Sequence, residues 1–362
     1  NEAGEFRFEG ISSPYDVALL SEQVGDYTHA WVYQGLTRPD PTLQVFFGLP
    51  GRGSGPVGLY SGLELTPTQK LSFAAAGPQG AWSYFDAYGD FSNSGIGWSG
   101  PSQAAFTFHA LWWETSESGL PSSYLAHDQQ AVLLAENASA EVRFDLSHDD
   151  IAASSVAGSV SGGGGDVERY NYAYLQFADQ AQIQLFSTAA PEAAFDYIVP
   201  ALPEMRVVVA ATEGLFGSEY AIAHREVAAG DRNIQLEIPR PVRPQAPESG
   251  VTGVGPGSVF AWEGEAAAYL LFIEDVATRR RALRVLTSSK RVTLPRLPYF
   301  ALTPGGEHYW RVETHGRGRN IDELAGPEGF VDAFSSPAGG SGGPRRSEGS
   351  YSISLGRSFI AE

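Results

Sequence analysis

The chain contains no cysteine among its 362 residues. Disulfides, cysteine nucleophiles and thiolate metal sites are therefore excluded. Lysine is nearly absent as well, because Lys70 and Lys290 are the only two and arginine carries the rest of the positive charge. No stretch approaches the roughly 18 consecutive apolar residues of a membrane span, and we expect neither a span nor a signal peptide. A strand-like pattern follows Asn1 almost at once, so we expect a processed or truncated N-terminus.

The charge is strongly negative, with a formal net charge of −18 and a pI near 4.8. Such a surface repels phosphate backbones, so nucleic acid is not an expected partner. At 43% apolar and 12% aromatic residues the chain can build hydrophobic cores, and its length suggests two to four domains. The 42 glycines and 23 prolines indicate many short strands joined by turns.

One pattern recurs at a spacing of about 90 to 100 residues, which suits whole sandwich domains better than short solenoid turns. Each copy has an alternating strand, a small-residue segment with a histidine, and a closing alternating strand. The copies are Phe195–Ile238 with His224, Phe106–Leu146 with His127, and Phe6–Phe46 with His29. We interpret the three histidines as structural, because no carboxylate pattern recurs beside them.

These patterns predict an all-β chain of tandem antiparallel β-sandwiches. The expected units are a partial sandwich over 1–50, a full one over 51–146, the cleanest copy over 147–240, a proline-rich linker over 241–249 and a last unit over 250–362. The opening strands of a sandwich are missing from 1–50. A half sandwich has an open sheet edge, which could accept a strand from a neighbouring chain.

The unit over 147–240 carries a motif series that resembles a known family. A V-x-G-x-V strand is followed by F-x-Y, by Leu-Pro before V-x-V, and by a final I-x-L-x-I. The matching residues are Val156, Gly158, Val160, Phe195, Tyr197, Leu202, Pro203, Val207, Val209, Ile234, Leu236 and Ile238. The series resembles the carboxypeptidase regulatory-like domains, which are prealbumin-like sandwiches, and the upstream copies match it more loosely.

The last unit has the aromatic positions of another sandwich. Val259–Trp262 fits a strand with a core tryptophan, Tyr269–Ile273 the next strand, and Leu302–Val312 a leucine-to-tyrosine corner. The unit resembles a fibronectin type III domain, one class of immunoglobulin-like sandwich. Its loop over 316–350 is unusually long and contains a potential helix at Ile321–Phe334. The two resemblances together imply a bacterial surface or secreted protein.

Carboxylates cluster where the second and third units meet. Asp145, Asp149 and Asp150 lie within six positions of one another. Calcium held by these oxygens would stiffen the junction, and it is the one structural metal that the sequence suggests. The alternative is that the Asp149–Asp150 pair only caps a turn.

Aromatic residues crowd positions 82–113, where Trp98, Trp112 and Trp113 are the candidates for contacts with a glycan or a protein partner. Flat rings can stack on sugars. Trp112 and Trp113 are adjacent on a strand, so their side chains point to opposite faces, and at least one belongs to a core. Core packing of most of these residues is the competing interpretation.

The sequence offers no catalytic constellation. No pair of carboxylates stands out as a glycosidase requires, and the G-x-G-x-x-G and G-x-S-x-G matches lie in flexible tracts. We therefore expect a non-catalytic protein of the cell envelope or the extracellular space, with a structural or adhesive role and no cofactor. Its partners would be proteins or glycans at the cell surface, or further copies of the chain. The alternative is a carbohydrate-binding accessory region of a secreted polysaccharide-active protein.

Overall fold

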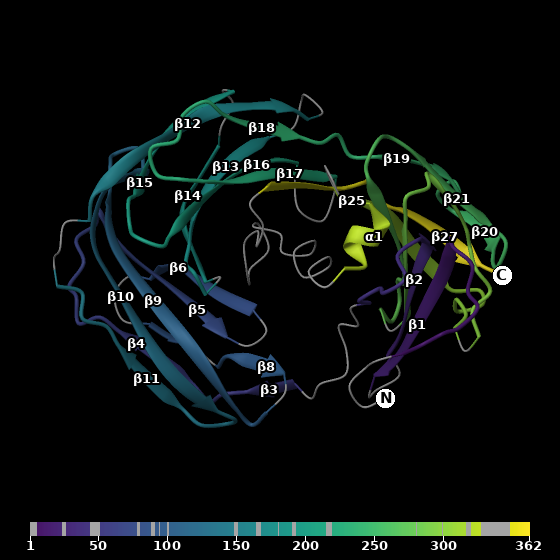
Figure 1. Ribbon diagram of the computed structural model, residues 1–362, viewed down its shortest axis with the longest axis horizontal. Helices are drawn as coiled ribbons and strands as arrows, with labels where there is room; N and C mark the ends of the chain where they lie inside the picture. The colour runs from purple at the N-terminus through teal and green to yellow at the C-terminus, as the bar shows by residue number, and fades with distance from the viewer. Residues whose placement is uncertain are drawn as a thin grey trace.

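The computed structural model describes residues 6–23, 27–43, 51–77, 80–87, 91–93, 95–99, 101–147, 151–163, 168–179, 181–189, 193–214, 219–279, 281–298, 300–315, 320–326 and 348–362. Nearly all of these residues lie in β-strands or in the turns between them, and the helix among them, α1 (Ile321–Leu324), has four residues. The predicted all-β fold of packed sheets is confirmed. Figure 1 shows the sheets following one another along a curved wall.

Residues 51–147 form a unit of layered sheets around an aromatic core. Phe73, Phe106 and Phe108 are buried between its layers. The larger sheet has the order β10 (Pro121–Ala135), β9 (Gln103–Thr115), β5 (Gln69–Gly77), β6 (Gly80–Ala87). The smaller sheets are β11 (Ala140–Arg143), β4 (Val57–Tyr60), β7 (Phe91–Asn93), and the pair β3 (Gly51–Gly53) and β8 (Gly97–Ser99).

The third unit repeats the topology of the second unit's four-stranded sheet and of its β11–β4–β7 sheet, without a counterpart of the β3–β8 pair among the described residues. Its larger sheet runs β17 (Tyr220–Val227), β16 (Arg206–Gly214), β13 (Arg169–Gln176), β14 (Gln182–Ala189), and its smaller sheet β18 (Ile234–Ile238), β12 (Ala153–Gly162), β15 (Ala194–Pro200). In both units the closing strand pairs in parallel with the opening one, β11 with β4 and β18 with β12. The sequence alignment of the repeat was wrong in one respect. Phe106 and Phe108 lie in β9, which corresponds to β16 and not to β15, the strand of Phe195 and Tyr197.

The C-terminal unit is a second kind of two-layer sandwich. One layer is β19 (Arg243–Ala246), β21 (Val259–Glu263), β24 (Arg291–Thr293). The facing layer contains β23 (Arg281–Thr287), β22 (Ala268–Asp275) and β25 (Glu307–His315), with β27 (Arg357–Ala361) between β25 and β20 (Val251–Val254). Phe260, Trp310 and Phe359 fill the space between the layers and meet edge to face. The residues expected to form a linker over 241–249 instead supply β19, and Val242 is buried in this core.

The N-terminal residues do not form a partial sandwich of their own. β1 (Tyr15–Gln23) and β2 (Tyr27–Leu36) make a hairpin, and β2 pairs in parallel with β23 over Thr28–Tyr33. Ala30 and Val32 thereby join the core of the C-terminal unit. The apolar face that a half sandwich would leave open on β2 is therefore covered by a unit 250 residues further along the chain.

One strand links the last two units into a single sheet. β26 (Glu348–Ile353) pairs with β17 on one side and with β25 on the other, which gives a 12-stranded sheet that runs from β1 to β14. The chain leaves β26 at Ser354 and re-enters the sheet as β27, so its last residues form two strands of the same sheet.

The second and third units share a core. Leu111, Trp113 and Tyr124 point away from the second unit's own core and pack with Val156 and Ile183 of the third unit. The Tyr124 hydroxyl donates a hydrogen bond to the Ile198 carbonyl oxygen at 2.9 Å. A buried apolar contact of this kind fixes the two units relative to each other.

Candidate functional site

The predicted calcium cluster falls largely outside the described residues. Asp149 and Asp150 are among the residues that the structure leaves undescribed. Asp145 follows β11, and its backbone N–H donates to Oδ2 of Asp128 at 2.8 Å. Across the described ranges, no three His, Asp or Glu side chains are grouped as a metal site requires. Calcium at Asp149 and Asp150 stays a prediction.

The candidate tryptophans are packed and do not form a flat exposed platform. Trp98 is buried against the edge of Phe106, and its Nε1–H donates to the Pro101 carbonyl oxygen at 2.7 Å. Trp113 is buried in the shared core, and its Nε1–H donates to Oγ of Ser72 at 3.3 Å. Trp112 is half-buried on the opposite face, against the second unit's core. The expected ligand-binding face is therefore corrected for Trp98 and Trp113, whose rings a ligand cannot reach.

A histidine pair lies between the second and third units. Nε2 of His109, in β9, is 2.8 Å from Oδ2 of Asp179 in the turn after β13. Nδ1 of the same ring is 3.4 Å from Nε2 of His127 in β10. Phe177 stacks on His109 with ring centroids 3.8 Å apart. Sequence analysis singled out His127 but missed His109 and Asp179, because their partnership depends on how the two units dock.

The environment of this pair keeps His127 neutral. Burial, and secondarily the neighbouring His109, lower the pKa of His127 to about 4, while Asp128 acts in the opposite direction. Burial also disfavours the charged form of Asp179, but hydrogen bonds from His109 and from the Ala181 amide outweigh it, and the Asp179 pKa is lowered. An Asp that accepts from a buried ring N–H fixes that ring's tautomer. The arrangement is a structural junction.

A row of alternating rings and guanidinium groups crosses four strands of the 12-stranded sheet. Trp31 of β2 lies opposite Arg284 of β23, Arg284 opposite Phe272 of β22, and Phe272 opposite Arg311 of β25. The Arg284 guanidinium carbon is 4.9 Å from the Trp31 ring centroid and 4.7 Å from that of Phe272. The Arg311 guanidinium carbon is 4.8 Å from the Phe272 ring centroid. We call these four residues the cation–aromatic row.

The end of this row is neutralised by a buried carboxylate. Nε and Nη2 of Arg311 donate to Oε1 of Glu313 at 2.9 and 2.7 Å. The Tyr351 hydroxyl donates to Oε2 of the same carboxylate at 2.8 Å. Glu313 and Tyr351 come from β25 and β26, so this network fastens the strand that joins the two units.

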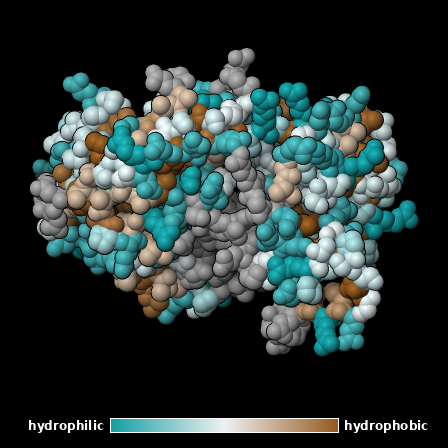
Figure 2. All heavy atoms as spheres, turned by 45° about the horizontal axis from the view of Figure 1, so that its top comes forward, coloured by the Kyte–Doolittle hydropathy of each residue, from teal (hydrophilic) through white to brown (hydrophobic). Residues whose placement is uncertain are grey.

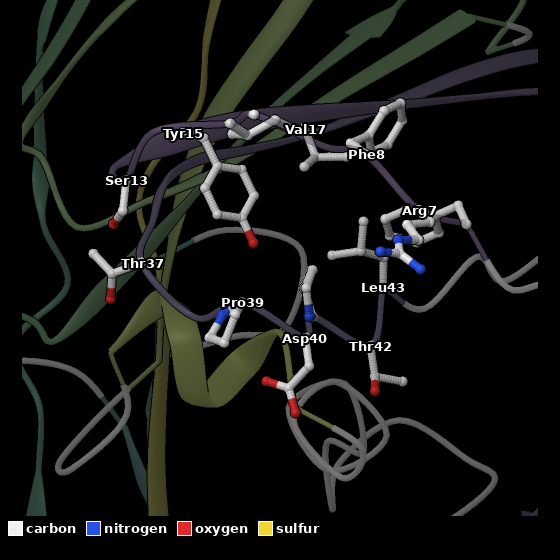
Figure 3. Close-up of a pocket in the computed structure, with 14 residues that line it drawn as sticks. Arg7, Phe8, Ser13, Tyr15, Val17, Thr37, Pro39, Asp40, Thr42 and Leu43 are labelled. Carbon is white, nitrogen blue, oxygen red and sulfur yellow. The ribbon is translucent and has the colours of Figure 1, made fainter.

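A cavity of about 720 Å³ lies beside the N-terminal hairpin (Figure 3). Tyr15 and Val17 of β1 form one wall, the segment from Pro39 to Leu43 forms another, and Arg7 and Phe8 border its mouth. The Tyr15 hydroxyl donates to the Arg38 carbonyl oxygen, which closes one corner. Phe6 and Phe8 have their rings 5.6 Å apart and are 46% and 65% exposed.

The helix beside the cavity is tied to the hairpin. Oδ1 of Asp322 accepts from the backbone N–H groups of Thr37 and Arg38 at 2.7 and 3.0 Å. Burial opposes ionisation of Asp322, but these hydrogen bonds outweigh it and lower the Asp322 pKa. Asn320 caps the helix, which covers Ile321–Leu324, and the part of the expected helix beyond residue 326 lies outside the described residues. This contact fixes the segment that lines the cavity.

β1 ends the 12-stranded sheet, and within the described ranges no strand pairs with its outer edge. Ala18 and Leu20 lie on the same face as Val32 and Ala30, their partners in β2. Val32 and Ala30 are buried in the sandwich core, whereas Ala18 is exposed and Leu20 is 38% exposed. The apolar face of the sheet therefore extends from β2 onto β1, where the facing layer no longer covers it. We call this edge and the adjoining cavity the β1 edge.

Hydrophilic residues predominate on the face in Figure 2, with hydrophobic residues interspersed. In the part of the chain that the structure describes, no helix has the length and hydropathy to cross a bilayer.

Comparison with known proteins identifies no family. No protein-family model and no curated protein matches the chain. Among solved structures, the shaft pilin from Lactobacillus rhamnosus GG aligns over 52% of this chain and 97% of its own, with 10% identity and a TM-score of 0.18. A leucine-rich repeat protein from Bacteroides thetaiotaomicron VPI-5482 aligns over 52% of this chain and 26% of its own, with 12% identity and the same TM-score. Alignments at this TM-score carry no argument about fold or function.

Proposed function

We propose that the protein is a non-catalytic structural subunit of the cell surface or extracellular space, which assembles by adding a strand from a second copy to the β1 edge. The observation that carries the proposal is β1 itself, a nine-residue strand at the end of a 12-stranded sheet. A long edge with free N–H and C=O groups is a template for another strand.

The composition of β1 supports this role. Natural proteins block sheet edges with lysine, proline or outward charges, and β1 contains neither lysine nor proline. The charge near its start, Asp16, is turned back onto the hairpin, where Oδ1 accepts from the Gly35 N–H at 2.8 Å. Beyond it the exposed positions Ala18 and Leu20 are apolar. Glu22, towards the end of β1, is the other charged residue of the strand, so the part of the edge that is open to pairing is centred on Ala18 and Leu20.

The side chains around the edge favour an apolar contact. An added strand would cover Leu20 and extend the core that already buries Ala30 and Val32. Phe6, Phe8 and Ile11 are exposed beside the cavity, with Ile11 at 51%. Exposed apolar residues gathered at one place mark interaction surfaces. A second copy is the occupant we propose, because each copy brings the same edge and the same apolar cover.

The cellular setting is part of the proposal. The strand order of the C-terminal unit, with β19–β21–β24 facing β23–β22–β25–β27, supports the resemblance to a fibronectin type III domain. The parallel closing pair of β12 and β18 supports the resemblance of the third unit to the regulatory-like sandwiches. Modules of both kinds serve as spacers in surface and secreted proteins, and tandem sandwiches hold their loops and edges apart for partners.

Light scattering after size-exclusion chromatography tests the proposal. The wild-type mass should rise with protein concentration, and more steeply in high salt, because salt screens repulsion between copies of charge −18. Leu20→Lys places a charge on the open edge and should hold the protein as a monomer. Val276→Lys is the matched control, since Val276 is 45% exposed in the turn after β22. One monomer mass at every concentration and salt level would refute the proposal.

A further inference from the structure

The cation–aromatic row contains one arginine in a direct ion pair and one that has no such pair among the described residues. Arg311 gives two hydrogen bonds to Glu313, at 2.9 and 2.7 Å. Arg284, half-buried one strand further along, donates from Nη1 to Nδ1 of His29 at 3.0 Å. Within the described chain, no carboxylate lies within ion-pair distance of Arg284. In place of a direct ion pair it has the faces of two aromatic rings and one imidazole, while Glu313 and Glu274 act on its charge from beyond ion-pair distance.

We infer that Arg284 is a binding site for the carboxylate of a small monoanionic ligand, held at the open edge of its guanidinium group between Trp31 and Phe272. The two rings lie over the guanidinium, at 4.9 and 4.7 Å from its central carbon. Rings at its faces leave the N–H groups at its edge for an acceptor. One N–H is used by His29, and the remaining fork matches the two oxygens of a carboxylate.

The surroundings select a single negative charge. Arg311 is paired with Glu313, so Arg284 is the cation of the row that has no direct carboxylate partner among the described residues. Glu274 and Glu313 act on Arg284 electrostatically from the neighbouring strands β22 and β25. These two carboxylates would repel a dianion such as sulfate more strongly than a monoanion. A monocarboxylate is the ligand that fits both the fork and the charge.

The row also suits this role because it is held rigidly. Trp31 and Phe272 are 3% and 7% exposed, so their rings cannot swing away from the guanidinium. Burial lowers the Arg284 pKa, with Arg311 adding to the effect and Glu313 and Glu274 opposing it. His29 accepts a hydrogen bond from Arg284 and is kept neutral, because burial and the adjacent guanidinium lower its pKa. A preorganised, poorly solvated cation gains more from an anion than a freely moving surface arginine does.

Modification by an arginine-specific dicarbonyl, read by peptide mass spectrometry, tests the inference on the native protein. Acetate or glucuronate, compared with chloride at equal ionic strength, should slow modification of Arg284 by about tenfold at saturation. Modification of Arg206, whose guanidinium lies on the surface, should not change. Sulfate at the same ionic strength should protect Arg284 much less.

Three results would overturn the assignment. Equal slowing at Arg206 would mean an ionic-strength effect, and equal protection by sulfate would mean an unselective cation. Failure of the reagent to modify ligand-free Arg284 would mean that its N–H edge is not accessible.

A variant gives an independent readout. Arg284→Lys keeps the charge but loses the planar fork, and it should retain the fold while weakening acetate binding by about tenfold. Binding is followed by tryptophan fluorescence, with Trp31→Phe identifying the signal that comes from Trp31. Arg206→Lys is the matched control and should bind as the wild type does. An Arg284→Lys variant that folds and binds acetate with unchanged affinity would contradict the inference. Assembly at the β1 edge is a separate property, and neither result decides the other.

Discussion

Nε2 of His109 lies 2.8 Å from Oδ2 of Asp179, 70 residues further along the chain, and this contact joins the second unit to the third. The histidine is 2% exposed and the carboxylate 30% exposed. Asp179 also accepts the Ala181 N–H at 3.0 Å through its other oxygen, so the carboxylate is held in place from both sides. Phe177 also stacks on the His109 ring. The turn of the third unit that carries Phe177 and Asp179 is therefore held against β9.

Removing this carboxylate's charge should weaken the junction. We expect Asp179→Asn to lower the free energy of unfolding by about 1–3 kcal/mol, the usual cost of losing a charge-assisted bond and leaving a buried partner unsatisfied. Urea denaturation at pH 7 measures it. Asp196→Asn is the control, because the Asp196–Arg232 pair at 3.3 Å is largely exposed and should contribute less than about 1 kcal/mol. Equal effects of the two substitutions would contradict a special role for Asp179.

Stability should fall between pH 6.5 and pH 4. Burial lowers the pKa values of His127, His224 and His315 from 6.5 to about 4 in the folded protein. The unfolded chain therefore takes up protons first as the pH falls, and unfolding becomes easier across that window. Each histidine contributes up to about 3 kcal/mol to the free energy of unfolding. This contribution is fully present above pH 6.5 and is lost as the pH falls towards 4. Urea denaturation from pH 7.5 to 4 should show a shallower decline in His127→Gln, and an identical decline would contradict the account.

Docking of the N-terminal hairpin should depend on Trp31. Trp31→Ala removes a ring that is 3% exposed and packs with Tyr33 and Leu286, and it should cost about 3–5 kcal/mol. Trp31→Phe keeps a ring over Arg284 and should cost much less. Limited proteolysis followed by mass spectrometry should detect early cleavage within the hairpin in Trp31→Ala alone. Equal resistance of the two variants would show that the hairpin is held by other contacts.

The parallel pairing of β12 with β18 should require Gly158. A Cβ atom at this position would collide with the Ile234 carbonyl oxygen and would lie 2.7 Å from Cζ of Phe195. Because the first obstacle is backbone, we expect Gly158→Ala to cost about 3 kcal/mol. Gly53→Ala is the control, since its nearest neighbour would be the Ile96 carbonyl oxygen at 3.9 Å. Thermal unfolding compares the two, and a neutral Gly158→Ala would argue against this register.

The strands were largely predictable, but their assembly was not. Alternation at Val156, Gly158 and Val160 and at Ile234, Leu236 and Ile238 marks β12 and β18, because period-two patterns follow from which face is buried. Local pattern does not specify a strand's partner. The pairing of β2 with β23 joins residues about 250 positions apart, and the first copy was therefore assigned to a sandwich of its own.

Side-chain partnerships were harder still to predict. Trp112 and Trp113 were expected on opposite faces, as the structure has them, but only docking of the third unit reveals that Trp113 is covered. Arg284 stood out neither by motif nor by spacing, because its aromatic neighbours come from β2 and β22. The alternation of aromatic rings and arginines across neighbouring strands can be recognised only when the pairing of those strands is known.

Hydrogen–deuterium exchange of the β1 amides, compared between dilute and concentrated protein in high salt, tests assembly at the β1 edge most directly. Among the described residues no strand pairs with the outer edge of β1, so its outward-facing amides should exchange quickly when the protein is dilute and slowly when it is concentrated. The same amides should stay fast at both concentrations in Leu20→Lys. A rise in mass without new protection in β1, or protection that concentration does not change, would contradict the account.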